Sequence, residues 1–161
     1  MKRLGGWQTL IIAFVFSFGV AGVGSWLTEL GPWYFSLKQP SWKPPDAAFG
    51  IIWTTIFTLL VFSGSLAWTA APTPERKRFV LVLFVINALV NMLWSALYFG
   101  LHRPDWAMVE WFALWLSVFS LVWFLWRESR WASILTLPYL IWVSAAGYLN
   151  WTTIVLNGPF A

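Results

Sequence analysis

The chain has 161 residues, of which 60% are hydrophobic and only 10% are charged. A soluble domain carries about 25% charged residues, so this composition excludes a water-soluble globular domain. The net charge of +4 comes from basic residues at the ends of apolar runs, so we expect no nucleic-acid partner. With no cysteine, the chain forms no disulfide and offers no thiolate ligand or cysteine nucleophile.

Long apolar runs separate the charged residues into a few clusters, with Glu110 as the one charge inside a run. Each run is long enough to cross a hydrocarbon core about 30 Å thick as a helix. Helices satisfy their backbone polar groups internally, as lipid requires, and the alternation of a membrane β-barrel is missing. The sequence therefore predicts an all-α integral membrane protein, a single domain built as a five-transmembrane-helix bundle. The expected spans are about 7–28, 47–70, 79–101, 106–126 and 131–156.

The first span follows Lys2 and Arg3, as the apolar segment of a signal peptide would. Its apolar run extends from Trp7 to Leu27, which is longer than the usual 7–15 residues of such a segment, and no clean cleavage pattern follows. We therefore expect a retained first helix.

The connection at 29–46 has a composition that a simple tether does not need. The stretch PSWKPPDAAFGIIW, at 40–53, combines three prolines, two tryptophans and a Lys/Asp pair. Prolines stiffen the chain and are tolerated in the first turn of a helix. We predict that this loop is a rigid lid over a pocket. The predicted lid residues are Trp33, Pro40, Trp42, Pro44 and Pro45.

The span at 79–101 carries Asn87 and Asn91 one helical turn apart, with Trp94 and Tyr98 on the same face. A buried amide in hydrocarbon needs hydrogen-bond partners. Two interpretations stay open: the asparagines bond to neighbouring helices, or they contact a ligand.

The next connection contains the lone His102 beside Arg103. A histidine in this position suits an interfacial residue better than a metal or haem ligand. We predict no metal site and no cofactor. Glu110 follows, a few residues inside the span at 106–126. An ionisable residue at depth indicates function, but Glu110 is near enough to the span's end to reach interfacial water or Arg103, so its role stays open.

The last span places Tyr139, Trp142, Ala146 and Asn150 on one helical stripe. Small residues at 145–147 leave room for a neighbouring helix or for a ligand. Trp53, Asn91, Trp94 and this stripe are expected at similar depth, in the outer half of the bundle. Apolar walls with a few polar groups are typical of a small-molecule pocket.

The basic residues predict an orientation. Because the number of spans is odd, seven basic residues share the N-terminal face and three, Lys38, Lys43 and Arg103, share the other. The positive-inside rule then places the N-terminus inside and the first loop outside. The sequence does not identify the host membrane.

Together these residues resemble the TspO/MBR family of translocator and tryptophan-rich sensory proteins, which are also described as peripheral-type benzodiazepine receptor-like. The matching elements are WY at 33–34, PSWKPP at 40–45 with Phe49 and Trp53, NxxxNxxW at 87–94, WAMVE at 106–110, and PYLIWxxxAxxLN at 138–150. They cover nearly the whole chain. One departure is that no basic residue follows Tyr148, so the cholesterol-recognition pattern of animal relatives is missing.

The resemblance implies a membrane bundle, commonly a homodimer, that binds porphyrins and benzodiazepine-type or isoquinoline-type ligands. Carried over by position, five residues match family positions in that pocket: Tyr34, Trp53, Asn87, Trp142 and Ala146. We add Asn91 and Trp94 as further ligand-binding residues. The expected partners are a porphyrin or another apolar small molecule, membrane lipid and a second copy of the chain.

Three functions remain open at this point. The first is a receptor or sensor that binds tetrapyrroles. The second is an enzyme that degrades porphyrin in light, with Trp53 and Trp142 as candidate electron donors, although no acid–base constellation predicts it. The third is a porphyrin or lipid transporter, although the sequence has no obvious repeat or ion-coupling charges.

Overall fold

The computed structural model describes residues 6–28 and 30–160, so Lys2, Arg3 and Glu29 lie outside the described residues. Five of the described helices are long and apolar enough to cross a membrane, and this confirms the predicted all-α, multi-pass fold class. The elements are α1 (Gly6–Leu27), α2 (Pro32–Ser36), α3 (Asp46–Ala70), α4 (Pro74–Ser95), η1 (Ala96–Gly100), α5 (Pro104–Leu125) and α6 (Arg130–Asn157).

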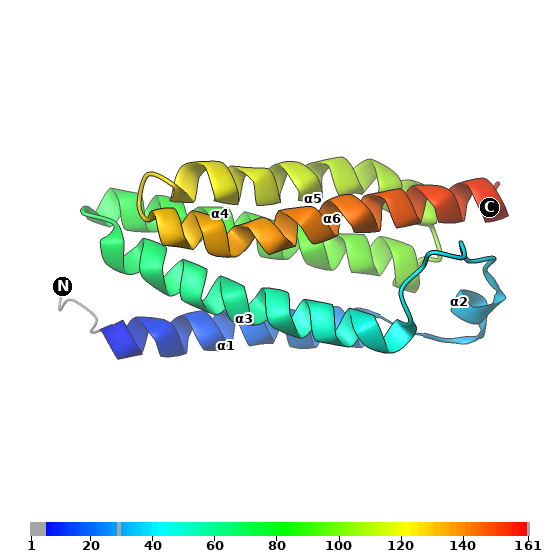
Figure 1. Cartoon of the computed structure of the whole chain (residues 1–161), viewed down its shortest axis with the longest axis horizontal. Helices are drawn as coiled ribbons and strands as arrows, with labels where there is room; N and C mark the ends of the chain where they lie inside the picture. Colours follow the sequence, from blue (N-terminus) through cyan, green and yellow to red (C-terminus); the bar gives the residue numbers. More distant parts are fainter. Residues whose placement is uncertain (1–5, 29, 161) are drawn as a thin grey trace.

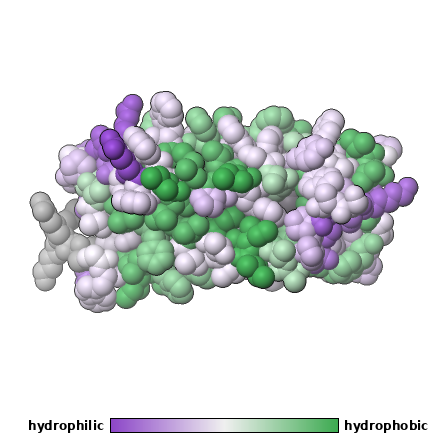
Figure 2. Space-filling model, viewed as in Figure 1, coloured by the Kyte–Doolittle hydropathy of each residue, from purple (hydrophilic) through white to green (hydrophobic). Residues whose placement is uncertain are grey.

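The long helices run alongside one another, and α1 begins at the end of the bundle opposite the end where α6 stops (Figure 1). The closest pairings are α5 with α6 and α1 with α3, while α1 also touches α4. The loop with the short helix α2 lies at the end where α6 stops. Hydrophilic residues gather at the two ends and hydrophobic ones across the middle of the visible face (Figure 2), as a membrane-spanning bundle requires.

Local sequence signals begin several helices. Pro74 occupies the first turn of α4, where its missing N–H costs nothing, and the preceding Thr73 side chain accepts a hydrogen bond from the Arg76 amide at 3.3 Å. Ser129 caps α6 in the same way, accepting from the Ala132 amide at 3.3 Å. Because α4 and α6 begin at these caps, the α3–α4 and α5–α6 connections are only a few residues long.

The structure differs from the expected spans in two places. Helix α4 begins at Pro74, whereas hydropathy predicted a start near 79, because hydropathy marks the hydrocarbon segment and the charged first turns of α4 lie beyond it. The connection at 29–46 also contains α2, which the sequence analysis did not predict. The other bounds lie within two residues of the expected ones.

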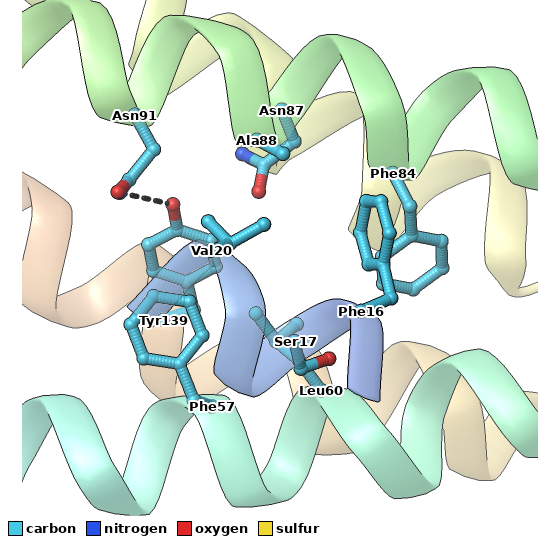
Figure 3. Close-up of a pocket in the computed structure, with 10 residues that line it drawn as sticks. All are labelled: Phe16, Ser17, Val20, Phe57, Leu60, Phe84, Asn87, Ala88, Asn91 and Tyr139. Carbon is cyan, nitrogen blue, oxygen red and sulfur yellow. Dashed lines mark hydrogen bonds between the residues drawn. The ribbon is translucent and has the colours of Figure 1, made fainter. Parts of the chain in front are cut away.

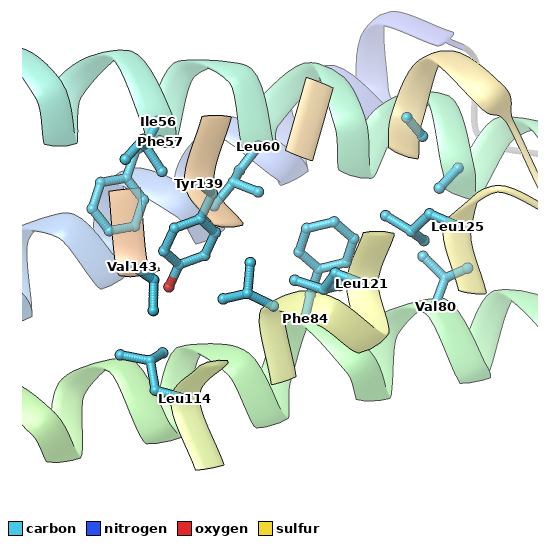
Figure 4. Close-up of a cluster of buried hydrophobic side chains, with 13 residues drawn as sticks. Ile56, Phe57, Leu60, Val80, Phe84, Leu114, Leu121, Leu125, Tyr139 and Val143 are labelled. Atoms are coloured by element: carbon cyan, nitrogen blue, oxygen red, sulfur yellow. The ribbon is translucent and has the colours of Figure 1, made fainter. Parts of the chain in front are cut away.

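Large side chains fill the half of the bundle nearest the α3–α4 and α5–α6 connections (Figure 4). Val118, Leu121 and Leu125 of α5 are fully buried there. Hydrogen bonds reinforce the packing, since Ser63 of α3 donates to the Ala132 carbonyl of α6 at 2.8 Å. This half of the bundle is solid, and the opposite half, beneath the long loop, is hollow.

Candidate functional site: a cavity beneath the first loop

A cavity of about 670 Å³ occupies the half of the bundle beneath the loop. All five long helices, η1 and the loop contribute to its wall. Six of the seven residues predicted to bind a ligand line it, namely Tyr34, Trp53, Asn91, Trp94, Trp142 and Ala146. The stripes expected on 79–101 and 131–156 therefore face a common space.

Asn87, the seventh predicted residue, lies deeper in the bundle. It lines a second, much smaller cavity of about 10 Å³, together with Asn91 and Tyr139 (Figure 3). Its amide donates to Ser117 Oγ of α5 at 2.9 Å, and the Asn91 amide donates to the Tyr139 hydroxyl of α6 at 2.8 Å. Both asparagines therefore join α4 to a neighbouring helix, and Asn91 alone of the two also reaches the large cavity.

The loop contributes to the cavity through residues other than the predicted lid residues. Among the described residues, its part of the wall consists of Leu30, Tyr34, Gln39 and Lys43, with Asp46 at the start of α3. The five predicted lid residues lie outside this wall. Their rings and prolines instead shape the loop that carries the lining residues.

Contacts at both ends of the loop hold it against the bundle. Trp33 stacks on His102 with ring centroids 4.2 Å apart, and Trp42 stacks on Tyr148 of α6 at 5.1 Å. Between them, the Lys38 amide donates to Asn157 Oδ1 at 2.7 Å. The Asn157 amide in turn donates to the Lys38 carbonyl at 2.9 Å. The loop is thus fastened to α6 and to the η1–α5 junction.

Lys43, Asp46 and Tyr34 form a polar triad at the mouth of the cavity. The Tyr34 hydroxyl donates to Asp46 Oδ1 at 2.9 Å, and Lys43 Nζ donates to the Tyr34 hydroxyl at 3.2 Å and to Asp46. Burial raises the pKa of Tyr34 above its usual value. Burial opposes the charge on Lys43, but its hydrogen bonds to Asp46 and Tyr34 outweigh this and raise the pKa of Lys43. Lys43 is therefore a stable cation at neutral pH.

Four polar groups on the cavity wall are buried without a hydrogen-bond partner among the described residues: Gln39 Nε2, Trp94 Nε1, Trp142 Nε1 and the Asn150 amide. Asn150 is only 2% exposed, and neither its oxygen nor its nitrogen is paired. Buried polar groups normally have partners, so orphans that face a cavity indicate space for a ligand or water. Helical periodicity put Asn150 on one stripe with Trp142 and Ala146, but Asn150 was not among the residues predicted to bind a ligand.

Trp111 is a wall residue that the sequence analysis did not predict. Its indole donates to the Val143 carbonyl of α6 at 2.8 Å and lies against Gly147. A Cβ added at Gly147 would lie 2.2 Å from Cε2 of Trp111, so only glycine leaves room for the ring. The small residues at 145–147 were a signal of this contact, but they did not identify the partner.

Glu110 lies outside the cavity wall. Both of its carboxyl oxygens are buried and have no partner among the described residues. Arg103, which the sequence offered as a partner, bonds instead to Asp105 at 2.5 Å. Glu110 is thus an unpaired polar group inside the bundle, separate from the site.

The fold and the cavity define a class: an integral, multi-pass membrane protein with a large aromatic chamber between its helices. Comparison with known proteins identifies the group within that class. The model of the TspO/MBR family matches residues 11–156, and the chain belongs to that family. Its relatives include tryptophan-rich sensory and translocator proteins.

Three relatives show the range of the similarity. The chain is 36% identical to the tryptophan-rich protein TspO of Chlorobaculum tepidum, over 92% of this chain and 94% of that one. It is 34% identical to protein CrtK of Rhodobacter capsulatus, over 92% and 93% of the two chains. It is 30% identical to the translocator protein of Bos taurus, over 74% and 71%.

Proposed function

We propose that this chain is a membrane receptor or sensor that binds porphyrins, and also benzodiazepine-type or isoquinoline-type molecules, in the cavity beneath the first loop. The observation that carries the proposal is the cavity itself, about 670 Å³ in volume, with ten aromatic side chains among the 28 described residues that line it. Small-molecule sites have volumes of roughly 300–1,000 Å³, with apolar walls and few polar groups. A flat, largely apolar ligand suits such a chamber.

The aromatic wall is held in place before any ligand arrives. Trp53 packs edge-on against Tyr139, with ring centroids 5.9 Å apart at 69°. Trp142 packs edge-on against Phe49 at 5.5 Å and 77°. Edge-to-face pairs are favourable ring arrangements, and side chains already fixed in position lose little entropy on binding. These indoles would therefore offer flat faces to a macrocycle at small cost.

The unpaired groups on the wall add a chemical preference. The indole N–H groups of Trp94 and Trp142 are donors, and the Asn150 amide offers both a donor and an acceptor. A ligand with acceptor atoms near its centre or edge would satisfy these groups. In the free protein, burial of these groups without partners costs free energy, and hydrogen bonds to the ligand would remove that cost.

Titration of purified protein with protoporphyrin in the dark, followed by tryptophan fluorescence, tests the proposal. We expect saturable quenching, with weaker binding after Trp53→Phe or Trp142→Phe, because each replaces an indole with a smaller ring that lacks the N–H donor, a loss below the roughly 0.5–1.5 kcal/mol of a whole aromatic pair. Trp126→Phe is the matched control, since Trp126 is 51% exposed and lies next to the α5–α6 connection. Absence of saturable quenching would contradict the proposed site.

A second candidate, light-dependent breakdown of porphyrin, draws support from one observation. Trp53 and Trp142 line the same cavity, so a bound macrocycle would contact both indoles and both could donate electrons to it. Illumination of the complex in air, followed by absorbance, separates the candidates. A protein-specific product that both Trp53→Phe and Trp142→Phe abolish would favour the enzyme. Unchanged porphyrin, or a product that forms equally in both variants, would support binding without catalysis.

A further inference from the structure

We propose that Lys43 makes the cavity mouth an anion subsite, and that the ligand of this site is therefore an amphiphile with a carboxylate at one end. This inference rests on the proposed function, because it names the chemistry that the same cavity selects. It predicts that the acid form of a porphyrin binds better than its neutral ester. It also predicts that Lys43 is responsible for the difference.

Lys43 is the one cationic side chain among the described residues of the cavity wall. Its Nζ lies 5.5 Å from the ring centroid of Tyr34 and 5.4 Å from that of Phe49, both of which also line the cavity. The ammonium is thus directed toward the aromatic chamber. A cation over aromatic faces beside a largely apolar space attracts an anion more strongly than one in water.

Asp46, the partner of Lys43, also lines the cavity but is more exposed than the lysine. The side chain of Asp46 is 40% exposed, whereas that of Lys43 is 13% exposed. A carboxylate in that position keeps part of its hydration, and its repulsion of a second anion is screened. Both members of the pair therefore line the cavity, and the positive member is the more enclosed of the two.

The hydrogen-bond count leaves Lys43 one donor for a ligand. An ammonium group has three N–H donors. The described residues take two of them, one at the Tyr34 hydroxyl and one at Asp46. The Tyr34 hydroxyl uses its own proton on Asp46. A ligand carboxylate at the mouth would accept the third proton of Lys43 in a charge-assisted hydrogen bond.

The loop sequence holds this lysine in position. The Lys43 amide donates to the Pro40 carbonyl at 3.0 Å, which closes a turn, and Pro44 and Pro45 then lead directly into α3 at Asp46. Proline fixes one backbone dihedral, so the segment has few other conformations. An ammonium held by such a frame loses little freedom when a ligand binds.

The test compares two probes, protoporphyrin with its two carboxylates and protoporphyrin dimethyl ester with none, on the full chain in detergent or lipid discs. Each probe is titrated against the wild type, Lys43→Met and Lys43→Arg. Lys38→Met is the matched control, because it removes the same charge from the same loop at a residue outside the cavity wall. Ratios between variants for one probe cancel the partitioning of that probe into detergent.

We expect Lys43→Met to weaken binding of the acid about tenfold, the scale of one hydrogen bond to a charged group. Binding of the ester should stay within about twofold, Lys43→Arg should restore most of the loss, and Lys38→Met should change neither probe. Equal weakening of both probes by Lys43→Met would overturn the inference and leave Lys43 as a tie between the loop and α3. An equal affinity of the wild type and Lys43→Met for the acid would overturn it as well.

The proposed function fails in a different and recognisable way. If neither probe binds the wild type with saturable quenching, the cavity is not a porphyrin site and the inference falls with it. If both bind and only the dependence on Lys43 is missing, the porphyrin site stands without an anion subsite. A thermal denaturation curve for each variant shows whether the lysine substitutions preserve the fold.

Discussion

At the scale of single residues, two unpaired polar side chains in the bundle have different surroundings. Asn150 faces the large cavity, whereas Glu110 lies outside the cavity wall. Each loses hydration without gaining a partner among the described residues, which costs stability. A ligand in the cavity could form hydrogen bonds with Asn150 but not with Glu110. A comparison of the two residues therefore distinguishes a role in binding from the cost of burying a polar group.

Replacing each residue with leucine tests this difference. We expect both Asn150→Leu and Glu110→Leu to raise the free energy of unfolding by about 1–3 kcal/mol, because each removes an unsatisfied buried group. Thermal denaturation measures the gain, and a porphyrin titration measures the affinity. Asn150→Leu should weaken binding while Glu110→Leu should not. Loss of affinity in the Glu110 variant would place that carboxyl in the binding mechanism after all.

At the scale of the helix pair, one indole both joins α5 to α6 and shapes the cavity. Trp111 lies against Gly147 and donates to the Val143 carbonyl, and its ring also lines the cavity. The same contact therefore sets both the spacing of the two helices and part of the cavity shape. Any side chain at position 147 has to displace the ring, because interiors are close-packed.

The substitution Gly147→Ala should lower the free energy of unfolding by about 1–3 kcal/mol, the usual cost of overpacking. It should also weaken ligand binding, since the displaced ring has the cavity beside it. Gly64→Ala is the matched control in another long helix, because its added Cβ would lie 3.5 Å from Phe84 Cζ, an ordinary contact. That variant should be neutral or slightly more stable, as alanine favours helix over glycine. A Gly147 variant as stable as the Gly64 variant would show that Trp111 moves aside freely.

At the scale of the whole molecule, packing and charge are both distributed unequally between the two ends. The solid half adjoins the connections that carry most of the described basic residues, and the hollow half adjoins the long loop. The first end carries Arg76, Lys77, Arg78, Arg127 and Arg130, against Lys38, Lys43 and Arg103 at the second. This bias supports the proposal that the cavity mouth and the loop face the outside. The homodimer stays a prediction.

Single cysteines test the orientation, since the chain has none of its own. Ser41 in the loop and Glu75 at the start of α4 are both exposed, and they lie near opposite ends of the bundle. In intact cells or sealed vesicles of known sidedness, an impermeant maleimide should label Ser41→Cys from outside and Glu75→Cys only after permeabilisation. The reverse pattern would invert the proposed topology.

The sequence by itself determined the class, the number of spans and the helix faces that carry polar and aromatic side chains. Hydropathy and helical periodicity are local properties, and both are read directly from residue order. They placed Trp142, Ala146 and Asn150 on one stripe, and Asn91 with Trp94 on another. They did not show which of these residues would reach the same space.

Only the tertiary structure decided which neighbour each face meets. Periodicity placed Asn87 and Asn91 on the same helix face and did not distinguish them. In the structure Asn87 donates a hydrogen bond to Ser117 of α5, whereas Asn91 also lines the cavity. The sequence predicted a lid of prolines and tryptophans. In the structure Lys43 and Tyr34 line the cavity, whereas the predicted lid residues lie outside its wall. These outcomes depend on contacts between residues far apart in the chain, such as Trp111 with Gly147, because helix packing brings such residues together and local pattern does not record it.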